Sequence, residues 1–145
     1  MERVTVYTDG ASAGNPGPSG WAFLMEGVLK SGSVAQATNN QMELYAIWQA
    51  VKYCPRAFEL HIVSDSKIAL GMVCIGWKGK NETLRHIRDS IHKLARHKCL
   101  RLTCALIKGH SGQRENALVD ERARLESQRE RSRQLSQQPS TKHPE

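Results

Sequence analysis

Three strand-like segments come before the first helix-like segment in this sequence of 145 residues. Residues 3–9, 20–26 and 28–34 either alternate apolar and polar side chains or form short apolar runs between turn residues, as strands do. Glu26-Gly27 joins the second and third segments and is typical of a tight hairpin turn. Consecutive strands with short connections pair antiparallel, so the start of the chain predicts a three-stranded meander.

Helices and strands alternate in the rest of the chain. Thr38 and Gln41 match the two ends of a capping box, which predicts a helix that begins here and stops near Cys54-Pro55. The later predicted elements are a strand at 59–64, a short helix after Asp65, a helix from about Asn81, a strand at 101–108 and a helix from about Asn116. Helices between parallel strands make right-handed crossovers, so this order predicts an α/β fold with a five-stranded mixed sheet flanked by helices.

A hydrophobic fraction of 39% over 145 residues is typical of one globular domain. We place this domain at residues 1–126. Residues 127–145 are polar and basic, with Leu135 as their only large apolar side chain, which predicts a tail that is partly helical or disordered. No stretch reaches the roughly 18 apolar residues of a membrane span, and the N-terminus has no apolar signal segment. We therefore expect a soluble, cytoplasmic protein.

The four cysteines, Cys54, Cys74, Cys99 and Cys104, are widely spaced and include no C-x-x-C pair. They lie in segments predicted to be helix or strand interior. We therefore expect neither a zinc site nor a disulfide, and we interpret these side chains as small buried hydrophobic groups in a reducing compartment.

The chain carries 21 Lys and Arg against 14 Asp and Glu, a net charge of +7. A basic surface attracts polyanions through their phosphates, which favours nucleic acid as a partner. Surplus lysine for solubility explains the same charge, so charge alone leaves this question open.

Four acids, Asp9, Glu43, Asp65 and Asp120, each fall where a predicted strand ends or a predicted helix begins. The first and fourth strands run parallel in the predicted sheet, so Asp9 and Asp65 are expected at the same edge, and both helical acids can point toward it. Oxygen ligands without histidine or cysteine select Mg²⁺ or Mn²⁺ over zinc. Two such ions about 3.5–4 Å apart would activate a water and stabilise the leaving oxygen of a phosphodiester displacement.

Each of these acids has a simpler interpretation when it is taken alone. Asp9 fits a turn residue, Asp65 a helix N-cap, and Glu43 or Asp120 a solvated acid in a first helical turn. Their joint placement favours a metal site. The run Gly10–Gly20 lacks the Gly-Lys-Ser/Thr ending of a phosphate-binding P-loop, so we interpret it as a hairpin connection.

In four motifs, found in the family's order, the sequence resembles type 1 ribonuclease H. The motifs are Tyr7-Thr8-Asp9-Gly10 with Gly14-Asn15-Pro16-Gly17-Pro18 and Gly20-Trp21, Thr38-Asn39-Asn40-Gln41-Met42-Glu43-Leu44, Ser64-Asp65-Ser66, and Lys108-Gly109-His110 with Glu115-Asn116 and Asp120. The resemblance implies a ribonuclease H-like sheet with strand order 3-2-1-4-5. It also implies an endonuclease that cuts the RNA strand of RNA–DNA hybrids and leaves a 5′-phosphate and a 3′-hydroxyl.

The resemblance assigns roles by position. The four acids match the family's metal ligands, which implies two Mg²⁺ ions with Mn²⁺ as a substitute. His110 matches a histidine on a mobile loop that helps to deprotonate the water or release product, and histidine can move a proton near neutral pH. The expected substrate-binding residues are Asn15, Thr38, Asn39, Asn40, Gln41, Lys67, Trp77 and Asn116.

These substrate contacts have distinct expected targets. Asn15 and the Asn39–Gln41 segment match positions that contact minor-groove edges or RNA 2′-hydroxyls, and Thr38 matches part of a pocket for a DNA phosphate. Lys67 stands where relatives often place glutamine, so its contact is expected to be electrostatic. Trp77 lies in the short 75–81 connection, where many bacterial members carry an extra helix and a basic loop, and it is predicted to touch the DNA strand. The other two tryptophans, Trp21 and Trp48, are expected in the core.

Three alternatives stay open at this point. The first is a hybrid-binding module that has lost catalysis, and the presence of all four acids and His110 argues against it. The second is a relative that cuts DNA, and the Asn39–Gln41 segment argues against it. The third is a domain appended to a reverse transcriptase, and the Met1 start and polar end argue against it. We expect an RNA–DNA hybrid as partner, no membrane, no obligate protein partner and a monomer.

Overall fold

Five strands form one mixed sheet in the computed structural model of this protein, which describes residues 1–79, 81–108 and 113–138. The strands are β1 (Arg3–Ser12), β2 (Gly17–Met25), β3 (Val28–Ala37), β4 (Glu59–Ser64) and β5 (Arg101–Leu106). Their order is β3-β2-β1-β4-β5, with antiparallel pairing in the meander and parallel pairing of β4 with both β1 and β5. The predicted fold class and strand order are confirmed.

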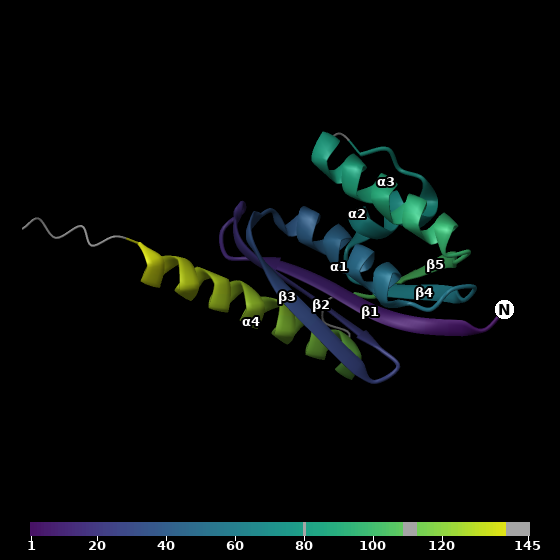
Figure 1. The fold of residues 1–145 in the computed structure, drawn as a ribbon, viewed down its shortest axis with the longest axis horizontal. Helices are drawn as coiled ribbons and strands as arrows, with labels where there is room; N and C mark the ends of the chain where they lie inside the picture. Colours follow the sequence, from purple (N-terminus) through teal and green to yellow (C-terminus); the bar gives the residue numbers. More distant parts are fainter. Residues whose placement is uncertain (80, 109–112, 139–145) are drawn as a thin grey trace, which may run out of the picture.

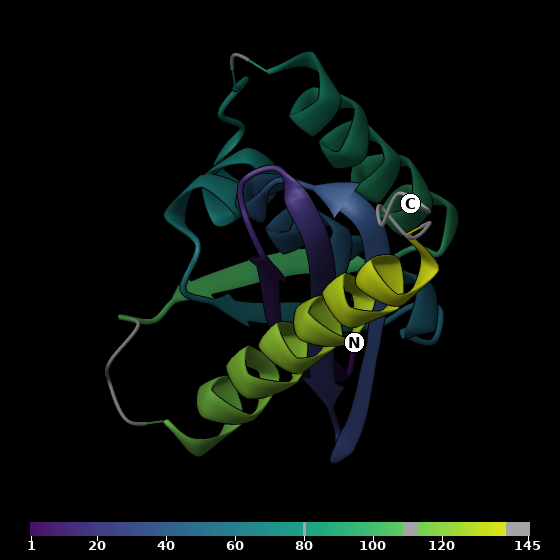
Figure 2. The same ribbon diagram turned by 90° about the vertical axis from the view of Figure 1, so that its left-hand side faces the viewer.

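Helices cover both faces of this sheet (Figure 1). They are α1 (Asn39–Tyr53), α2 (Lys67–Leu70), the π-helical turn η1 (Gly71–Ile75), α3 (Glu82–His97) and α4 (Arg114–Gln137). On one face α1 contacts β1 and β2 and packs against α3, whereas α4 lies on the other face against β1, β2 and β3. Figure 2 shows α4 crossing the strands of the meander.

The main hydrophobic core lies between the sheet and α1. Its fully buried side chains include Val6, Leu44, Ile47, Leu60 and Ile62. Alternate residues of a strand point to the same face, which is why these positions of β1 and β4 meet α1. A smaller cluster of Ala22, Val119 and Ala123 lies under α4. Small residues are needed there, because a Cβ at Gly20 would lie 2.2 Å from the carbonyl oxygen of Ala123.

The antiparallel ladder between β1 and β2 is longer than predicted. It continues to the pair Ser12↔Ser19, so residues 13–16 alone make the turn. Gly10 and Gly20 are paired strand residues of this ladder, which composition does not reveal. Asp9 therefore lies inside β1 and not at its end. The parallel pairing with β4 stops at Tyr7↔Val63, however, so Asp9 still lies beyond the parallel part of the sheet.

The turn at Glu26-Gly27 agrees with its prediction. Glu26 has φ of 50° and Gly27 has φ of 78°, the left-handed pair that a tight hairpin turn requires.

One pair of cysteines contradicts the expectation that the chain has no disulfide. Cys74 of η1 and Cys104 of β5 are bonded, with their Cα atoms 6.3 Å apart and a separation of 30 positions in sequence. Spacing along the chain could not show this pairing, because α3 lies between the two cysteines and returns the chain to η1. Cys54 is buried as expected, but Cys99 is exposed, so the interpretation as four buried hydrophobic groups is wrong.

The last helix, α4, runs through residue 126 without a break and ends at Gln137. Ser127 and Glu130 are buried, and the Ser127 hydroxyl donates to the carbonyl oxygen of Pro18 at 2.8 Å. Polar side chains can therefore hold this part of the helix, since they find hydrogen-bond partners on the sheet. The division of the chain at residue 126 stays a prediction. In the part of the chain that the structure describes, no helix is both long and apolar enough to cross a membrane.

Candidate active site

Three of the four predicted acids come together at the edge of the sheet. Asp9 lies on β1, Asp65 directly follows β4, and Glu43 lies in the second turn of α1. Each offers a carboxylate oxygen, and these three oxygens all lie within 4.8 Å of one another. Asp9 and Glu43 are buried, whereas Asp65 is half-buried. The parallel pairing of β1 with β4 thus brings Asp9 and Asp65 together, although they are 56 positions apart in the sequence.

Gly10 holds two of these acids in place. Its backbone N–H donates to Asp9 Oδ1 at 2.9 Å and also to Glu43 Oε1. A Cβ at this position would lie 2.4 Å from the carbonyl carbon of Met42 and 2.6 Å from the backbone nitrogen of Glu43. The absence of a side chain therefore lets α1 approach β1 closely enough for both carboxylates to share one donor.

The capping box predicted for α1 is present and orients its first turn. The Thr38 hydroxyl accepts from the backbone N–H of Gln41 at 3.2 Å, and Gln41 Oε1 accepts from the backbone N–H of Thr38 at 2.9 Å. Asn15 adds a third contact, because its Oδ1 accepts from the backbone N–H of Asn39 at 2.9 Å. The β1–β2 turn is thereby attached to the helix that carries Glu43.

Mutual repulsion and burial disfavour ionisation of the cluster. Burial raises the pKa of Asp9 to about 7, a hydrogen bond with Glu43 partly offsets this rise, and the charge of Asp65 adds to it. Burial, followed by the charge of Asp9, raises the pKa of Glu43 well above its usual value. Burial and then the charge of Asp120 raise the pKa of Asp65. A cation among these groups would remove the repulsion, because it favours the charged form of each carboxyl.

Asp120, the fourth predicted acid, lies on α4 at the rim of the same cleft. Its Oδ2 accepts from Arg124 Nη2 at 3.1 Å, and its side chain is 45% exposed. It is not among the three acids whose oxygens lie within 4.8 Å. The structure thus places Asp120 beside the cluster and already paired with a cation.

A cleft of about 420 Å³ contains all four acids. Its other lining residues are Gly10, Ala11, Ser12, Asn39, Asn40, Ser66 and Arg124. Ser12 and Arg124 had no predicted role, and Ser66 was predicted only as part of the Ser64-Asp65-Ser66 motif. The sequence could have predicted that Arg124 lies beside Asp120, since residues four apart are neighbours on one helix face.

The other predicted substrate-binding residues differ in how far their side chains are exposed. Lys67 is exposed at the first position of α2, and Asn116 is buried in the first turns of α4. The side chain of Gln41 and the hydroxyl of Thr38 are engaged in the cap, so Asn39 and Asn40 are the exposed members of that segment. His110 lies outside the described residues.

Trp77 is 40% exposed and packs on Gly71, where a Cβ would lie 2.1 Å from its indole ring. The connection that carries it is attached to α3, because Arg88 Nη1 donates to the carbonyl oxygens of Trp77 and Lys78 at 3.1 and 3.3 Å. Trp21 and Trp48 pack against the main core, as expected.

The donor set at the cleft floor fits a magnesium or manganese site. It consists of three carboxylates, which are hard oxygen ligands. Their raised pKa values show that the folded chain alone does not compensate their charge.

Comparison with known proteins assigns the family. A family model for RNase H matches residues 1–128. This chain belongs to the ribonuclease H family. Ribonuclease H of Chromohalobacter salexigens is 39% identical over 139 residues, covering 83% of this chain and 81% of that protein. Ribonuclease H of Helicobacter acinonychis is 34% identical over 137 residues, which cover 89% of this chain and 96% of that protein. The predictions of the family and of a ribonuclease H enzyme are confirmed.

Solved structures of ribonuclease H domains share the fold. The N-terminal RNase H domain of a Mycobacterium tuberculosis protein, solved as a fusion with maltose binding protein, has a TM-score of 0.77 at 21% identity and covers 92% of this chain and 99% of its own. LC11-RNase H1 in complex with an RNA/DNA hybrid has a TM-score of 0.74 at 23% identity, and the match covers 87% of this chain and 97% of that protein. These identities show a common fold and no more.

Proposed function

We propose that this ribonuclease H is a divalent-metal-dependent endonuclease that hydrolyses the RNA strand of RNA–DNA hybrids to 5′-phosphate and 3′-hydroxyl products. The observation that carries the proposal is the cluster of Asp9, Glu43 and Asp65, whose oxygens lie within 4.8 Å of one another at the floor of an open cleft. A family member solved with an RNA/DNA hybrid supports the choice of substrate.

The four acids would hold two Mg²⁺ ions, for which Mn²⁺ is a substitute. When bound, the ions supply an activated water and neutralise charge on the attacking and leaving oxygens of the phosphodiester. The chain's own contribution is to keep its ligands close: the Gly10 N–H bonds both Asp9 and Glu43. Asp120 would join them from the rim of the cleft on α4, where Arg124 pairs with it.

Residues around the cleft would select the hybrid. Asn39 and Asn40 are exposed at the N-terminus of α1 and line the cleft, where their amides can bond base edges and RNA 2′-hydroxyls. We assign Asn15 and Gln41 to the same contacts, Thr38 to a pocket for a DNA phosphate, and Asn116 to the substrate-binding residues as well. Thr38 and Gln41 contribute through the cap that fixes α1.

Lys67 and Trp77 would add further contacts to the hybrid. Lys67 is exposed and suits a phosphate, and the exposed part of Trp77 suits stacking on the DNA strand. We assign the proton transfer at the water or the leaving group to His110, because an imidazole can gain and lose a proton near neutral pH.

A cleavage panel tests this proposal. A labelled RNA–DNA hybrid of about 20 base pairs, long enough to cover the cleft and the phosphates on either side of it, is incubated with Mg²⁺, Mn²⁺ or EDTA beside an RNA duplex, a DNA duplex and both single strands. We expect metal-dependent cutting of the RNA strand in the hybrid alone. Cutting of the DNA duplex would favour a DNA-directed nuclease, and hybrid binding without cutting would favour a binding module. A monomeric state and a cytoplasmic location stay predictions, which size-exclusion chromatography and cell fractionation would check.

A further inference from the structure

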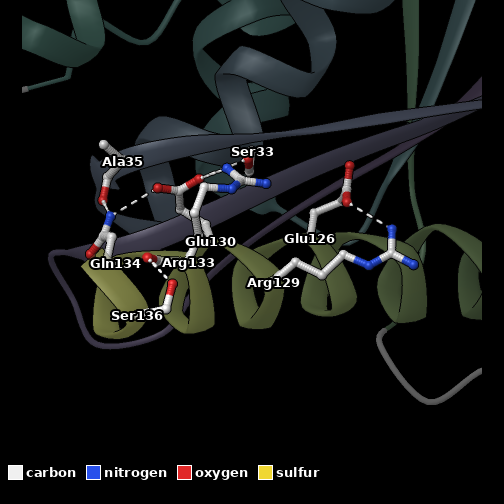
Figure 3. Close-up of polar contacts among 8 residues, drawn as sticks. All are labelled: Ser33, Ala35, Glu126, Arg129, Glu130, Arg133, Gln134 and Ser136. Carbon is white, nitrogen blue, oxygen red and sulfur yellow. Dashed lines mark hydrogen bonds and ion pairs between the residues drawn. The ribbon is translucent and has the colours of Figure 1, made fainter. Parts of the chain in front are cut away.

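The last helix continues beyond the part of the chain that the family model matches. The match ends at residue 128, whereas α4 continues to Gln137. This extension is attached to the edge strand β3, as Figure 3 shows. Ser33 Oγ donates to Glu130 Oε1 at 3.1 Å, and Gln134 Nε2 donates to the carbonyl oxygen of Ala35 at 2.7 Å. The extension is thus positioned on the sheet and presents its remaining side chains in a defined register.

The arginines of α4 fall on two opposite flanks. A helix turns by about 100° per residue, so Arg124, four residues after Asp120, and Arg131, eleven residues after it, lie within about 40° of Asp120 around the axis. Arg129 is nine residues after Asp120 and lies about 180° away. The flank that carries the candidate active-site acid Asp120 is therefore continued by Arg124 and Arg131.

Three arginines of α4 pair with an acid on the same helix, either on the flank that carries Asp120 (the near flank) or on the opposite flank (the far flank). On the far flank, Arg129 pairs with Glu126 at 3.3 Å and Arg133 pairs with Glu130 (Figure 3). On the near flank, Arg124 pairs with Asp120. No acid among residues 1–79, 81–108 and 113–138 forms an ion pair with Arg131, which is exposed. Arg122, on the far flank, also forms no ion pair within the described residues, but it is half-buried. Arg131 is therefore the exposed arginine of the near flank whose charge no acid of the described residues compensates.

The distance from Asp120 to Arg131 along α4 can be expressed in nucleotides of a bound strand. Arg131 lies roughly 16 Å along the axis from Asp120, at about 1.5 Å per residue. Phosphates of one strand advance by about 3.4 Å per nucleotide, so this distance corresponds to about five nucleotides beyond the cleft. In Figure 1 the C-terminal end of α4 extends past the sheet at the end where the β1–β2 turn lies.

We infer that Arg124 and Arg131 form a phosphate-binding stripe on α4, along which a duplex bound in the cleft continues for about five nucleotides. Arg124 lines the cleft and Arg131 contacts a phosphate farther along. A guanidinium suits this task, because its planar set of donors matches phosphate oxygens. The inference rests on the proposed function, since the stripe extends the binding site for the same substrate.

Two matched variants test the stripe. Arg131→Gln and Arg129→Gln each remove one positive charge from an exposed position on the same helix, and glutamine has nearly the helix propensity of arginine. Equilibrium binding of the same hybrid is measured in EDTA over a range of salt concentrations, and cleavage by the parent protein is measured in Mg²⁺. Thermal melts confirm that both variants are folded.

For Arg131→Gln we expect a roughly threefold to tenfold loss of affinity and a salt-dependence slope smaller by about one unit, as for one lost phosphate contact. We expect Arg129→Gln to leave the slope near that of the parent. Equal slopes for the two variants, with cleavage by the parent intact, would overturn the stripe alone. A parent that neither binds nor cuts the hybrid would overturn both the stripe and the proposed function.

Discussion

Asp9 and Glu43 accept hydrogen bonds from the same backbone N–H, that of Gly10. One residue comes from a strand and the other from a helix, so this shared donor joins β1 to α1 at the floor of the cleft. Two carboxylates held together in this way repel each other unless a proton or a cation is present. The geometry of the backbone thus concentrates negative charge that a bound divalent ion would compensate.

Gly10→Ala should separate these two acids. Its Cβ would meet Met42 and Glu43 backbone atoms at 2.4 and 2.6 Å, so α1 must move away from β1. We expect a loss of roughly 1–3 kcal/mol in the free energy of unfolding. Misplacement of Glu43 should lower the rate of hybrid cleavage by about 100-fold. Urea titration and single-turnover cleavage measure the two effects.

Gly27→Ala is the control for this variant. Gly27 has φ of 78°, and a Cβ at this position would have no neighbouring atom within 4 Å, so alanine is strained there without displacing anything. It should lower stability by about 1 kcal/mol and leave the rate of cleavage unchanged. Equal losses of cleavage in both variants would show that reduced stability, and not the position of Glu43, limits activity.

Asp9→Asn should abolish cleavage while the protein stays folded. Asparagine keeps the shape of the side chain but removes the charge that a divalent ion requires. We expect the cleavage rate to fall by more than about 100-fold, beyond the usual effect of losing a residue that only supports a metal ligand. Asp89→Asn is a matched control, because Asp89 is an acid with a 67% exposed side chain on α3. Cleavage by Asp9→Asn at more than a few per cent of the parent rate would contradict the assignment.

Stability without metal should fall as the pH rises from about 4 to about 7. The pKa of Asp9 is 3.8 ordinarily and about 7 in the folded chain, so the folded state binds this proton more tightly than the unfolded state. A raised pKa contributes stability that is fully present below the unfolded value and is lost as the pH passes through the folded value. Thermal melts in EDTA across this range measure the trend, which should be weaker in Asp9→Asn.

Mg²⁺ should counter this loss above about pH 7, since it binds the ionised cluster of the folded chain. At about ten times its Kd, an ion stabilises by about 1.4 kcal/mol, which corresponds to a rise in Tm of roughly 3–6 °C. A Tm that Mg²⁺ leaves unchanged over the whole pH range would argue against a site formed before the substrate binds.

The four cysteines should react in three steps. Cys99 is exposed and should react with a thiol reagent in the native protein, whereas Cys54 is buried and its pKa is raised by burial. Cys54 should therefore react only after unfolding, and Cys74 and Cys104 only after reduction. Thiol titration of native, denatured and reduced protein should count about one, two and four groups. Four thiols in denatured protein that has not been reduced would contradict the disulfide.

Local pattern was sufficient for much of the fold. The alternation of apolar and polar residues predicted the strands, and Glu26-Gly27 predicted the hairpin turn. Thr38 and Gln41 predicted the start of α1. Each of these signals acts between residues close in sequence, where propensity and hydrogen bonding are decided locally. The order of elements then limited the sheet to few topologies, because short connections and right-handed crossovers exclude most alternatives.

Contacts between distant segments were decided by the tertiary structure alone. The sequence by itself determined that Asp9 and Asp65 lie at one edge of the sheet, since both follow from strand direction. Only packing decided that Glu43 joins them through the Gly10 N–H, that Asp120 stays at the rim with Arg124, and that Cys74 meets Cys104. These distances depend on how closely helices approach the sheet. Side-chain volume sets this distance between helix and sheet, as the lack of space for a Cβ at Gly10 and Gly20 shows. The periodicity of the sequence contains no information about it.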